Sequence, residues 1–357
     1  MNRINQDRIA KQLHISRTTV SRSLANHPSI SAETRERVLK LAESLGYSSS
    51  PSRMLRRRRT GKPLTVGVLI GVPAANVEMA TFPFILKGLR ERADADRIAI
   101  DVCYQDPATF DATAKRQTIF RNIRAGNWRG VILIYPFPTP AVDLISKKIS
   151  AVAVLEDYAE LGLDSIDVAE SDGFATLVQE LAQRGHRKIG FVAWHYPVGG
   201  HWTLRRFGGY VEGIFRQGLE FHPEWVFNIH RNSRPKVVGE PRLVAPELAR
   251  QVAERTRRDG VTAWVCAADH QAYQLIHDLR ALGVSVPGDC SVTGFDGIEP
   301  PAGLPRVMSM RVAHEDIGSS ALARLTSRIA HPNAPRRKIL VEASLVTGES
   351  VSPPRSA

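Results

Sequence analysis

The regular alternation of short apolar segments with amphipathic segments after residue 64 constrains the fold of this chain more than any other feature. Continuous apolar runs of this length are typical of strands buried on both faces of a sheet. Apolar residues at helical spacing, followed in several cases by glycine, are typical of helices that cover such a sheet. The alternation predicts an α/β fold with parallel sheets, and its repetition predicts two similar halves that face each other across a cleft. The expected strands are 64–72, 98–104, 130–135, 152–155, 188–194, 263–267 and 291–295, and the expected helices are 83–93, 113–124, 173–184, 207–217 and 271–282.

The positive charge of the chain is concentrated in its first sixth. The formal net charge is +12, and residues 1–63 hold 14 Lys and Arg against 4 Asp and Glu, an excess of ten. The other 294 residues are close to neutral, with 34 basic against 32 acidic side chains. A basic segment joined to a near-neutral body is typical of a protein that binds nucleic acid through that segment.

The basic segment also shows the spacing of three short helices. Apolar residues recur at helical intervals in each of them. Ser16 and Ser31 precede the second and third helix and can cap them, and Gly46 follows the third helix as a stop signal. A helix, a short turn, a second helix and a supporting third helix predict a helix-turn-helix domain over residues 1–47.

The second of these helices has a surface suited to DNA. When the apolar Val20 and Leu24 are turned inward, the remaining side chains are arginines and hydroxyls. Arginine can donate two hydrogen bonds to one guanine, and threonine offers both a hydroxyl and a methyl group to base edges. We therefore expect this helix to enter the major groove. The alternative is an ordinary three-helix bundle with a polar surface.

Residues 48–63 read SSSPSRMLRRRRTGKP and form a basic linker between the two parts. Serine and proline open it, and four consecutive arginines, Arg56 to Arg59, fill its centre. Like charges repel and extend a chain, so the sequence by itself is compatible with a solvated tether.

The stretch DRIAKQLHISRTTVSRSLANHPSISAETRERVLKLAESLGY resembles the N-terminal domain of the lactose/galactose-repressor (LacI/GalR) family of transcriptional regulators. The core ISRTTVSR, the segment SAETRERV and the following LGY carry the resemblance. It implies that Arg17, Thr18 and Arg22 read bases. It further implies four residues near the phosphates of the DNA: Ser16, Thr19, Ser21 and Asn26.

In the same family the linker folds into a short hinge helix on DNA and wedges an apolar side chain between bases in the minor groove. The resemblance therefore gives residues 48–63 a DNA-binding role as well. The expected wedge is Leu55 or Met54, with Leu55 favoured. Arg56 and Arg57 are expected to contact phosphates or the narrow groove.

The rest of the chain resembles the same family in RGHRKIGFVAW, in RRFGGYVEGIFRQGL and in the long block that ends SVPGDCSVTGFDGIE. LVTGES is similar to the family's C-terminal motif, with Gly348 where arginine is usual. The resemblance implies a periplasmic-binding-protein-like pair of Rossmann-like subdomains over residues 64–357, which binds the effector and forms the dimer. The expected N-subdomain is about 64–163 and 299–330, and the expected C-subdomain is about 164–298 and 331–350.

Seven side chains are expected at the effector cleft of this domain. Arg206 can donate to ligand hydroxyls or to a carboxylate, and carboxylates that end strands accept hydrogen bonds from sugar hydroxyls. Aromatic rings suit the flat faces of sugars and bases. The alternatives are a surface charge for the arginine, helix caps for the carboxylates and core positions for the rings. The expected effector residues are Phe82, Tyr135, Phe137, Trp194, Arg206, Asp269 and Asp296.

The motifs of other classes are missing from the sequence. It contains no GxGxxG after a strand, no GxxxxGK[ST], no HExxH, no CxxC and no GxSxG, so we expect no cofactor and no metal site. Three well-separated cysteines do not form a disulfide framework. The longest apolar run is too short to span a bilayer, and the N-terminus has no apolar signal-peptide core. These features indicate a bacterial cytoplasmic protein at the nucleoid.

The sequence therefore predicts a ligand-responsive, sequence-specific transcriptional regulator that binds a palindromic operator in double-stranded DNA as a homodimer. Repression of carbohydrate-related genes, with a sugar or sugar derivative as the effector, is the favoured interpretation. Activation by the same architecture is the first alternative. An α/β enzyme, a sugar-binding protein without a regulatory role and a DNA binder without an effector are the others.

Overall fold

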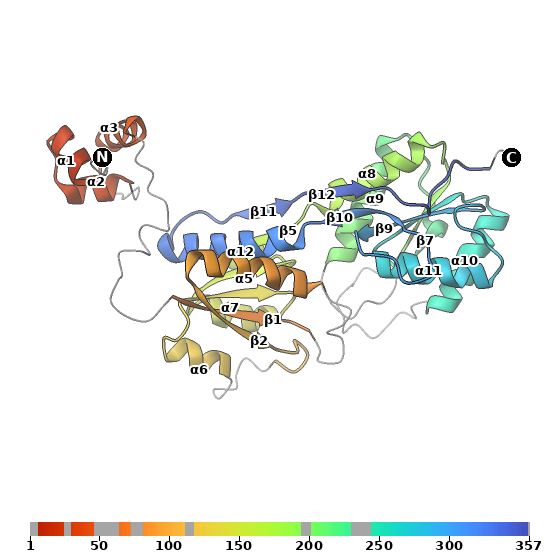
Figure 1. The fold of residues 1–357 in the computed structure, drawn as a ribbon, viewed down its shortest axis with the longest axis horizontal. Coiled ribbons are helices and arrows are strands. Elements are labelled where there is room, and N and C mark those ends of the chain that lie inside the picture. Colours follow the sequence, from red (N-terminus) through yellow and green to blue (C-terminus); the bar gives the residue numbers. More distant parts are fainter. Residues whose placement is uncertain are drawn as a thin grey trace. The chain divides into compact units, whose positions relative to one another are not determined.

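The computed structural model describes residues 6–24, 30–45, 64–72, 81–110, 118–193, 201–229 and 244–355 (Figure 1). The chain divides into two compact units, Met1–Lys62 and Pro63–Ala357. Within the described parts of both units, every helix is too short or too polar to cross a membrane.

The first unit holds three short helices around a small apolar centre. Ile9, Val20 and Val38 are fully buried where the three helices meet. This arrangement confirms the predicted helix-turn-helix fold. The helices are α1 (Gln6–Leu13), α2 (Arg17–Leu24) and α3 (Ala32–Ser44).

Two serines begin the second and third helices as the sequence predicts. The backbone N–H of Thr19 donates to the hydroxyl of Ser16 at 3.0 Å, and the N–H of Thr34 donates to that of Ser31 at 3.2 Å. Each hydroxyl thereby satisfies a backbone donor that has no partner inside its helix. His14, with a φ of 54°, makes the left-handed turn between α1 and α2.

The second unit is built on two six-stranded sheets, which confirms the predicted α/β fold. Neighbouring strands are parallel throughout, except for β10 and β12, which are antiparallel. The first sheet has the order β11 (Lys338–Val341), β5 (Asp164–Val168), β4 (Ser150–Val154), β3 (Gly130–Ile134), β1 (Thr65–Ile70) and β2 (Ala99–Tyr104). The second has the order β12 (Ala343–Val346), β10 (Met308–Val312), β9 (Ser291–Asp296), β8 (Ala263–Cys266), β6 (Ile189–Val192) and β7 (Val226–Phe227).

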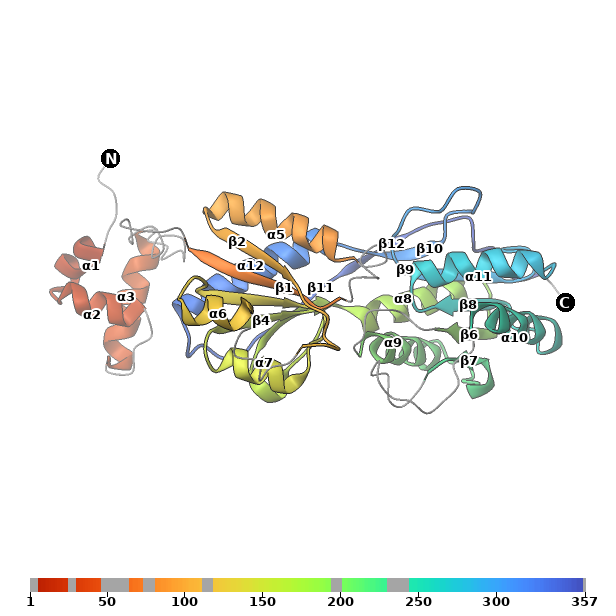
Figure 2. The ribbon, with the colours of Figure 1, turned by 90° about the horizontal axis from the view of Figure 1, so that it is seen from below.

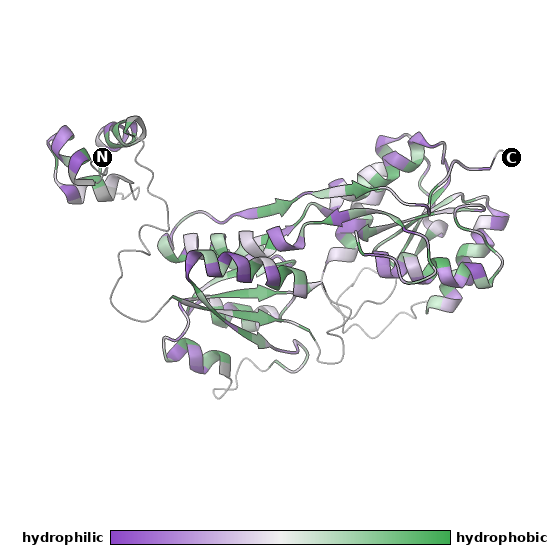
Figure 3. Ribbon diagram, in the orientation of Figure 1, coloured by the Kyte–Doolittle hydropathy of each residue, from purple (hydrophilic) through white to green (hydrophobic). Residues whose placement is uncertain are grey.

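Helices cover the sheets, and the central strands β1 and β3 of the first sheet are mostly hydrophobic and buried (Figure 3). The first sheet carries α5 (Phe82–Asp96), α6 (Thr118–Arg124), α7 (Thr139–Ser146) and α12 (His314–Ala330). The second carries α8 (Glu170–Gln183), α9 (Trp202–Arg216), α10 (Ala245–Arg258) and α11 (Asp269–Ala281). The sequence analysis missed α7, α10 and α12, and it placed the start of α9 at residue 207, five residues too late.

The chain crosses between the sheets later than predicted. The expected crossings lay near residues 163, 298 and 330, but β5 and β11 pair with each other in the first sheet, and β10 pairs with β9 in the second. The crossings therefore follow Val168, Val312 and Val341. A local apolar pattern identifies a strand, whereas the sheet that the strand joins depends on hydrogen bonds to distant parts of the chain.

Two glycines let α5 and α12 approach closely on the first sheet, where they lie side by side in Figures 1 and 2. A Cβ atom at Gly318 would overlap the backbone carbonyl oxygen of Ile85, and one at Gly88 would overlap that of Glu315. The contact therefore requires hydrogen at both positions. It fixes α12, whose N-terminus reaches the edge of the cleft described below.

We expect Gly318→Ala to lower the free energy of unfolding by about 1–3 kcal/mol, because the added methyl group meets backbone that cannot rotate away. Denaturant unfolding of the full chain measures it. Gly208→Ala in α9 is the matched control, since a Cβ there meets open space and alanine is the better helix former. Equal effects of the two substitutions would contradict the close-packing argument.

Candidate ligand-binding cleft and DNA-binding surface

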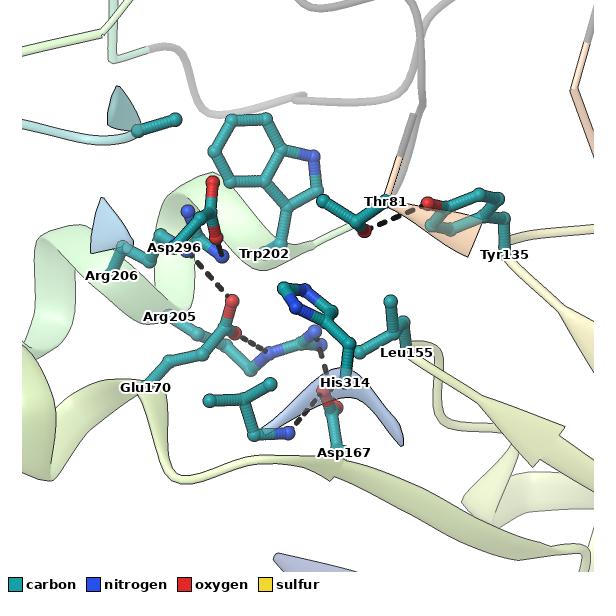
Figure 4. Close-up of a pocket in the computed structure, with 12 residues that line it drawn as sticks. Thr81, Tyr135, Leu155, Asp167, Glu170, Trp202, Arg205, Arg206, Asp296 and His314 are labelled. Atoms are coloured by element: carbon teal, nitrogen blue, oxygen red, sulfur yellow. Dashed lines mark hydrogen bonds and ion pairs between the residues drawn. The ribbon is translucent and has the colours of Figure 1, made fainter. Parts of the chain in front are cut away.

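A pocket lies where the carboxyl ends of the two sheets face each other. Tyr135, Leu155 and Val168 stand at the ends of β3, β4 and β5, while Ala268 and Asp296 stand at those of β8 and β9. Ligands of open α/β sheets bind at this edge. The other lining residues are Thr81, Asp167, Glu170, Trp202, Arg205, Arg206 and His314 (Figure 4).

Arg206 is held from three sides. Its Nε donates to Glu170 Oε1 at 2.8 Å, its Nη1 to the carbonyl oxygen of Ala267 at 2.7 Å and its Nη2 to Asp296 Oδ1 at 3.1 Å. The guanidinium carbon also lies 4.9 Å from the ring centre of Trp202. Burial acts to lower the pKa of Arg206, but the two carboxylates outweigh it and raise the pKa, so the side chain is charged.

Arg205 links Glu170 to Asp167. Its Nε donates to Glu170 Oε2 at 2.6 Å, and its Nη2 lies 3.2 Å from Asp167 Oδ2. Asp167 is 1% exposed. Its pKa is raised to about 6, chiefly by burial; Arg205 acts in the opposite direction, and Glu170 contributes to the rise. The cleft thus holds a carboxylate that is costly to ionise.

Polar and aromatic groups complete the lining. The hydroxyls of Tyr135 and Thr81 are 3.0 Å apart. In Figure 4 the rings of Trp202 and His314 lie between the ion pairs on one side and these two hydroxyls on the other. Burial lowers the pKa of His314, so its ring is neutral near pH 7. Within the described residues, no three His, Cys, Asp or Glu side chains are grouped so as to hold a metal ion.

The structure brings three of the seven predicted effector residues to this pocket, namely Tyr135, Arg206 and Asp296. Trp194 lies outside the described residues. Phe82, Phe137 and Asp269 are absent from the lining of this pocket.

Asp269 is a structural residue. It is fully buried, and its two oxygens accept hydrogen bonds from the N–H of Ile298 at 2.7 Å and the hydroxyl of Ser309 at 2.7 Å. Burial and the nearby Asp296 raise its pKa to about 7. The side chain therefore ties the turn after β9 to β10 beneath the pocket rather than facing a ligand.

The two phenylalanines belong to the core of the first subdomain. Phe82 packs edge-on against Tyr104 with ring centres 5.7 Å apart. Phe137 packs against Phe110 at 5.9 Å and lies beside Gly71. Both rings are almost completely buried by protein atoms.

Sequence reasoning missed several lining residues. Glu170 lines the pocket but was not among the residues expected there. Trp202 was missed because the start of α9 was placed too late, and Arg205 was missed because its partner Glu170 was not expected at the cleft. Asp167 was missed because it lies in the segment DSIDV, whose polar residues do not show the apolar pattern expected of a buried strand. The adjacent arginines of LRRFGGY were the available signal for Arg205.

The candidate DNA-binding surface is the outward face of α2. Arg17 and Thr18 are exposed, while Val20 faces the core and the buried Ser23 donates to the carbonyl oxygen of Thr19. Ser16 is exposed and also accepts the capping hydrogen bond. The structure does not describe the side chains of Ser21 and Arg22, and Asn26, Met54, Leu55, Arg56 and Arg57 lie outside the described residues.

Comparison with known proteins agrees with both parts of the chain. Residues 7–50 match the family described as bacterial regulatory proteins, lacI family, and residues 178–351 match a periplasmic binding protein-like domain. The ribose operon repressor of Haemophilus influenzae is 25% identical over 347 residues, which cover 96% of this chain and 97% of that protein. The repressor PurR of Mannheimia succiniciproducens is 23% identical over the same shares of the two chains.

Solved structures show the same fold. A lac repressor dimer bound to operator and an anti-inducer matches 98% of this chain and all of its own, with a TM-score of 0.61 and 20% identity. The regulator CelR in complex with cellobiose matches the same shares, with a TM-score of 0.61 and 21% identity. A helix-turn-helix unit joined to a two-sheet domain with a cleft defines a DNA-binding regulator of transcription. Residues 7–50 thus match a lacI-family DNA-binding domain and residues 178–351 a periplasmic-binding-protein-like domain, which confirms the predicted resemblance.

We expect Asp269→Ala to lower the free energy of unfolding by about 2–4 kcal/mol, because it leaves the N–H of Ile298 and the hydroxyl of Ser309 without an acceptor. Asp269→Asn should cost less, since its amide oxygen can still accept one bond and the Ser309 hydroxyl can reverse. Denaturant unfolding of both variants measures this. An undisturbed stability of Asp269→Ala would argue against the structural role.

The stability of the protein should depend on the charge of Asp167. Its pKa is about 6 in the folded protein against an ordinary 3.8, so the folded state binds more protons than the unfolded state between pH 4 and 6. The contribution of Asp167 to wild-type stability should therefore fall as pH rises through this window. The side chain of Asp167→Asn does not ionise. The free energy of unfolding of this variant, relative to that of wild type, should therefore rise by about 1–3 kcal/mol from pH 4 to pH 7.5.

Thermal or denaturant unfolding at both pH values measures the effect. Asp172→Asn is the matched control, because Asp172 is an exposed carboxylate in the first turn of α8. Parallel pH profiles for Asp167→Asn and wild type would show that Asp167 titrates normally.

Proposed function

We propose that the chain represses carbohydrate-related genes by binding an operator through α2 and a small carbohydrate in the cleft. The observation that carries the proposal is the position of the pocket at the place where the chain crosses between the two subdomains after Val168 and Val312. A ligand there contacts both subdomains and can change how they sit together. The operon repressed by the relative from Haemophilus influenzae is named for ribose, and CelR was solved with cellobiose.

We further propose that the protein acts as a homodimer on a palindromic operator, since two copies related by a two-fold axis present two recognition helices. The lac repressor was solved as a dimer bound to its operator. On DNA, Arg17, Thr18 and Arg22 would read bases, and the residues near phosphates would be Ser16, Thr19, Ser21 and Asn26. A protein with this role works at the bacterial nucleoid in the cytoplasm.

The linker over residues 48–63 is proposed to join in DNA binding. Leu55, with Met54 as the alternative, would wedge between bases in the minor groove. Arg56 and Arg57 would contact phosphates there. Ligand binding would act on this segment by moving the subdomain to which it is joined.

The cleft is proposed to bind its ligand without transforming it. Glu170 and Asp296 hold arginines in short ion pairs, so neither is an uncommitted acid or base. Activation of transcription instead of repression remains the alternative, and a reporter gene downstream of the operator distinguishes the two.

We expect Arg17→Ala to weaken binding to the preferred operator by about 1–3 kcal/mol and to relax the base preference at one position of each half-site. The operator is obtained by in vitro selection from random DNA, and titrations of wild type and variant on its single-base variants measure the effect.

Lys40→Gln is the matched control, because Lys40 is exposed on α3 and pairs with Glu36 at 2.9 Å away from the face of α2. It should leave the base preference unchanged. If the Arg17→Ala variant selects the same operator sequence as wild type with the same base preferences, Arg17 does not read a base.

A further inference from the structure

The two arginines of the cleft already form ion pairs with carboxylates of the chain. Arg206 has an acceptor at each of its three nitrogens, and both Arg205 and Arg206 donate to Glu170. Three carboxylates, those of Asp167, Glu170 and Asp296, face two guanidinium groups. The described residues that line the pocket therefore carry one excess formal negative charge and no uncommitted positive charge, which disfavours an anionic ligand.

One donor and one acceptor in this network lack a hydrogen-bond partner among the described residues. Arg205 Nη2 and Asp167 Oδ2 are 3.2 Å apart, close enough to attract each other, but their geometry is not that of a hydrogen bond. The other oxygen of Asp167 accepts from the backbone N–H of Val168 at 2.9 Å. Buried polar atoms of this kind are costly unless something completes their hydrogen bonds.

A hydroxyl group is the chemical group that satisfies both atoms together. It can donate its hydrogen to the carboxylate oxygen of Asp167 and accept from the guanidinium of Arg205 at the same time. A carboxylate or phosphate accepts only and is repelled by Asp167, and an ammonium donates only and is repelled by Arg205. The two atoms therefore define a hydroxyl-binding position.

We propose that Asp167 and Arg205 form a hydroxyl-binding pair that selects an uncharged polyhydroxy ligand over its carboxylated and phosphorylated counterparts. The inference rests on the proposed function of the cleft as an effector site. Asp167 belongs to β5 of the first sheet and Arg205 to α9 beside the second. A hydroxyl that bonds to both side chains contacts both subdomains, so the pair that selects the ligand also stabilises one arrangement of the subdomains.

The first experiment compares matched ligands on the full-length protein. The probes are glucose, galactose, ribose and cellobiose, together with glucuronate, galacturonate, glucose 6-phosphate and ribose 5-phosphate. Thermal shift finds the sugars that bind, calorimetric titration gives their Kd, and operator titrations show whether each one changes DNA binding. We expect at least one neutral sugar to bind and to change operator affinity, and its acidic counterparts to bind at least tenfold more weakly.

The second experiment changes the pair itself. Asp167→Asn replaces the acceptor with an amide and removes the negative charge, so it should weaken the neutral sugar at least tenfold. It should also bring the Kd of the acidic sugar closer to that of the neutral sugar. Asp172→Asn makes the same chemical change at an exposed site of α8 and should leave both affinities at their wild-type values. The unfolding temperature without ligand shows that each variant is folded.

The outcomes separate this inference from the proposed function. If an acidic sugar binds as well as its neutral counterpart, or if Asp167→Asn leaves the ratio of their Kd values unchanged, the hydroxyl-binding pair is wrong while the effector cleft stands. If Asp167→Asn alters stability but neither affinity, the two atoms have a structural role and the hydroxyl-binding pair is wrong. If no probe binds or changes operator affinity, the carbohydrate effector and the pair are both rejected.

Discussion

Glu170 is the carboxylate on which the arrangement of the cleft depends. It begins α8 directly after the first crossing between the sheets, and it holds Arg205 and Arg206 at 2.6 and 2.8 Å. Through Arg206 it is connected to Asp296 at the end of β9, and through Arg205 to Asp167 at the end of β5. Buried ion pairs add little net stability but enforce a specific geometry, because each charge left alone would be costly. One side chain thereby fixes the polar groups of both subdomains around a common space.

The elements of the fold were largely predictable because local patterns determine them. The capping serines of α2 and α3 and the apolar runs of β1 and β3 act over a few residues, and the structure has them where the sequence places them. The crossings were misplaced because pairing is not local. Asp164–Val168 carries two aspartates, and it is a strand because β4 and β11 flank it. Its membership in the first sheet moves the boundary of that subdomain.

The candidate site shows the same division between local and distant causes. Asp269 and Asp296 both stand at the ends of strands, so the sequence treats them alike. Asp296 has a φ of 116° and turns toward Arg206, whereas Asp269 starts α11 and is captured by Ser309 from the neighbouring β10. The two aspartates differ because Asp269 accepts a hydrogen bond from Ser309, which lies 40 residues later in the sequence. Arg206 was found because its neighbours form a family motif, and Arg205 beside it was missed because its function depends on an unexpected glutamate.

The chain has two groups of charged side chains, one in its basic N-terminal segment and one in the cleft, and salt affects them differently. The excess of ten positive charges in residues 1–63 favours binding to the phosphates of DNA, and salt weakens such an attraction steeply. The charges of the cleft are buried and paired at distances of about 3 Å, where salt has little influence. The body around the cleft is close to neutral, so it adds little long-range attraction for DNA. Such a chain can hold its ligand affinity constant while its DNA affinity responds to the ionic conditions of the cell.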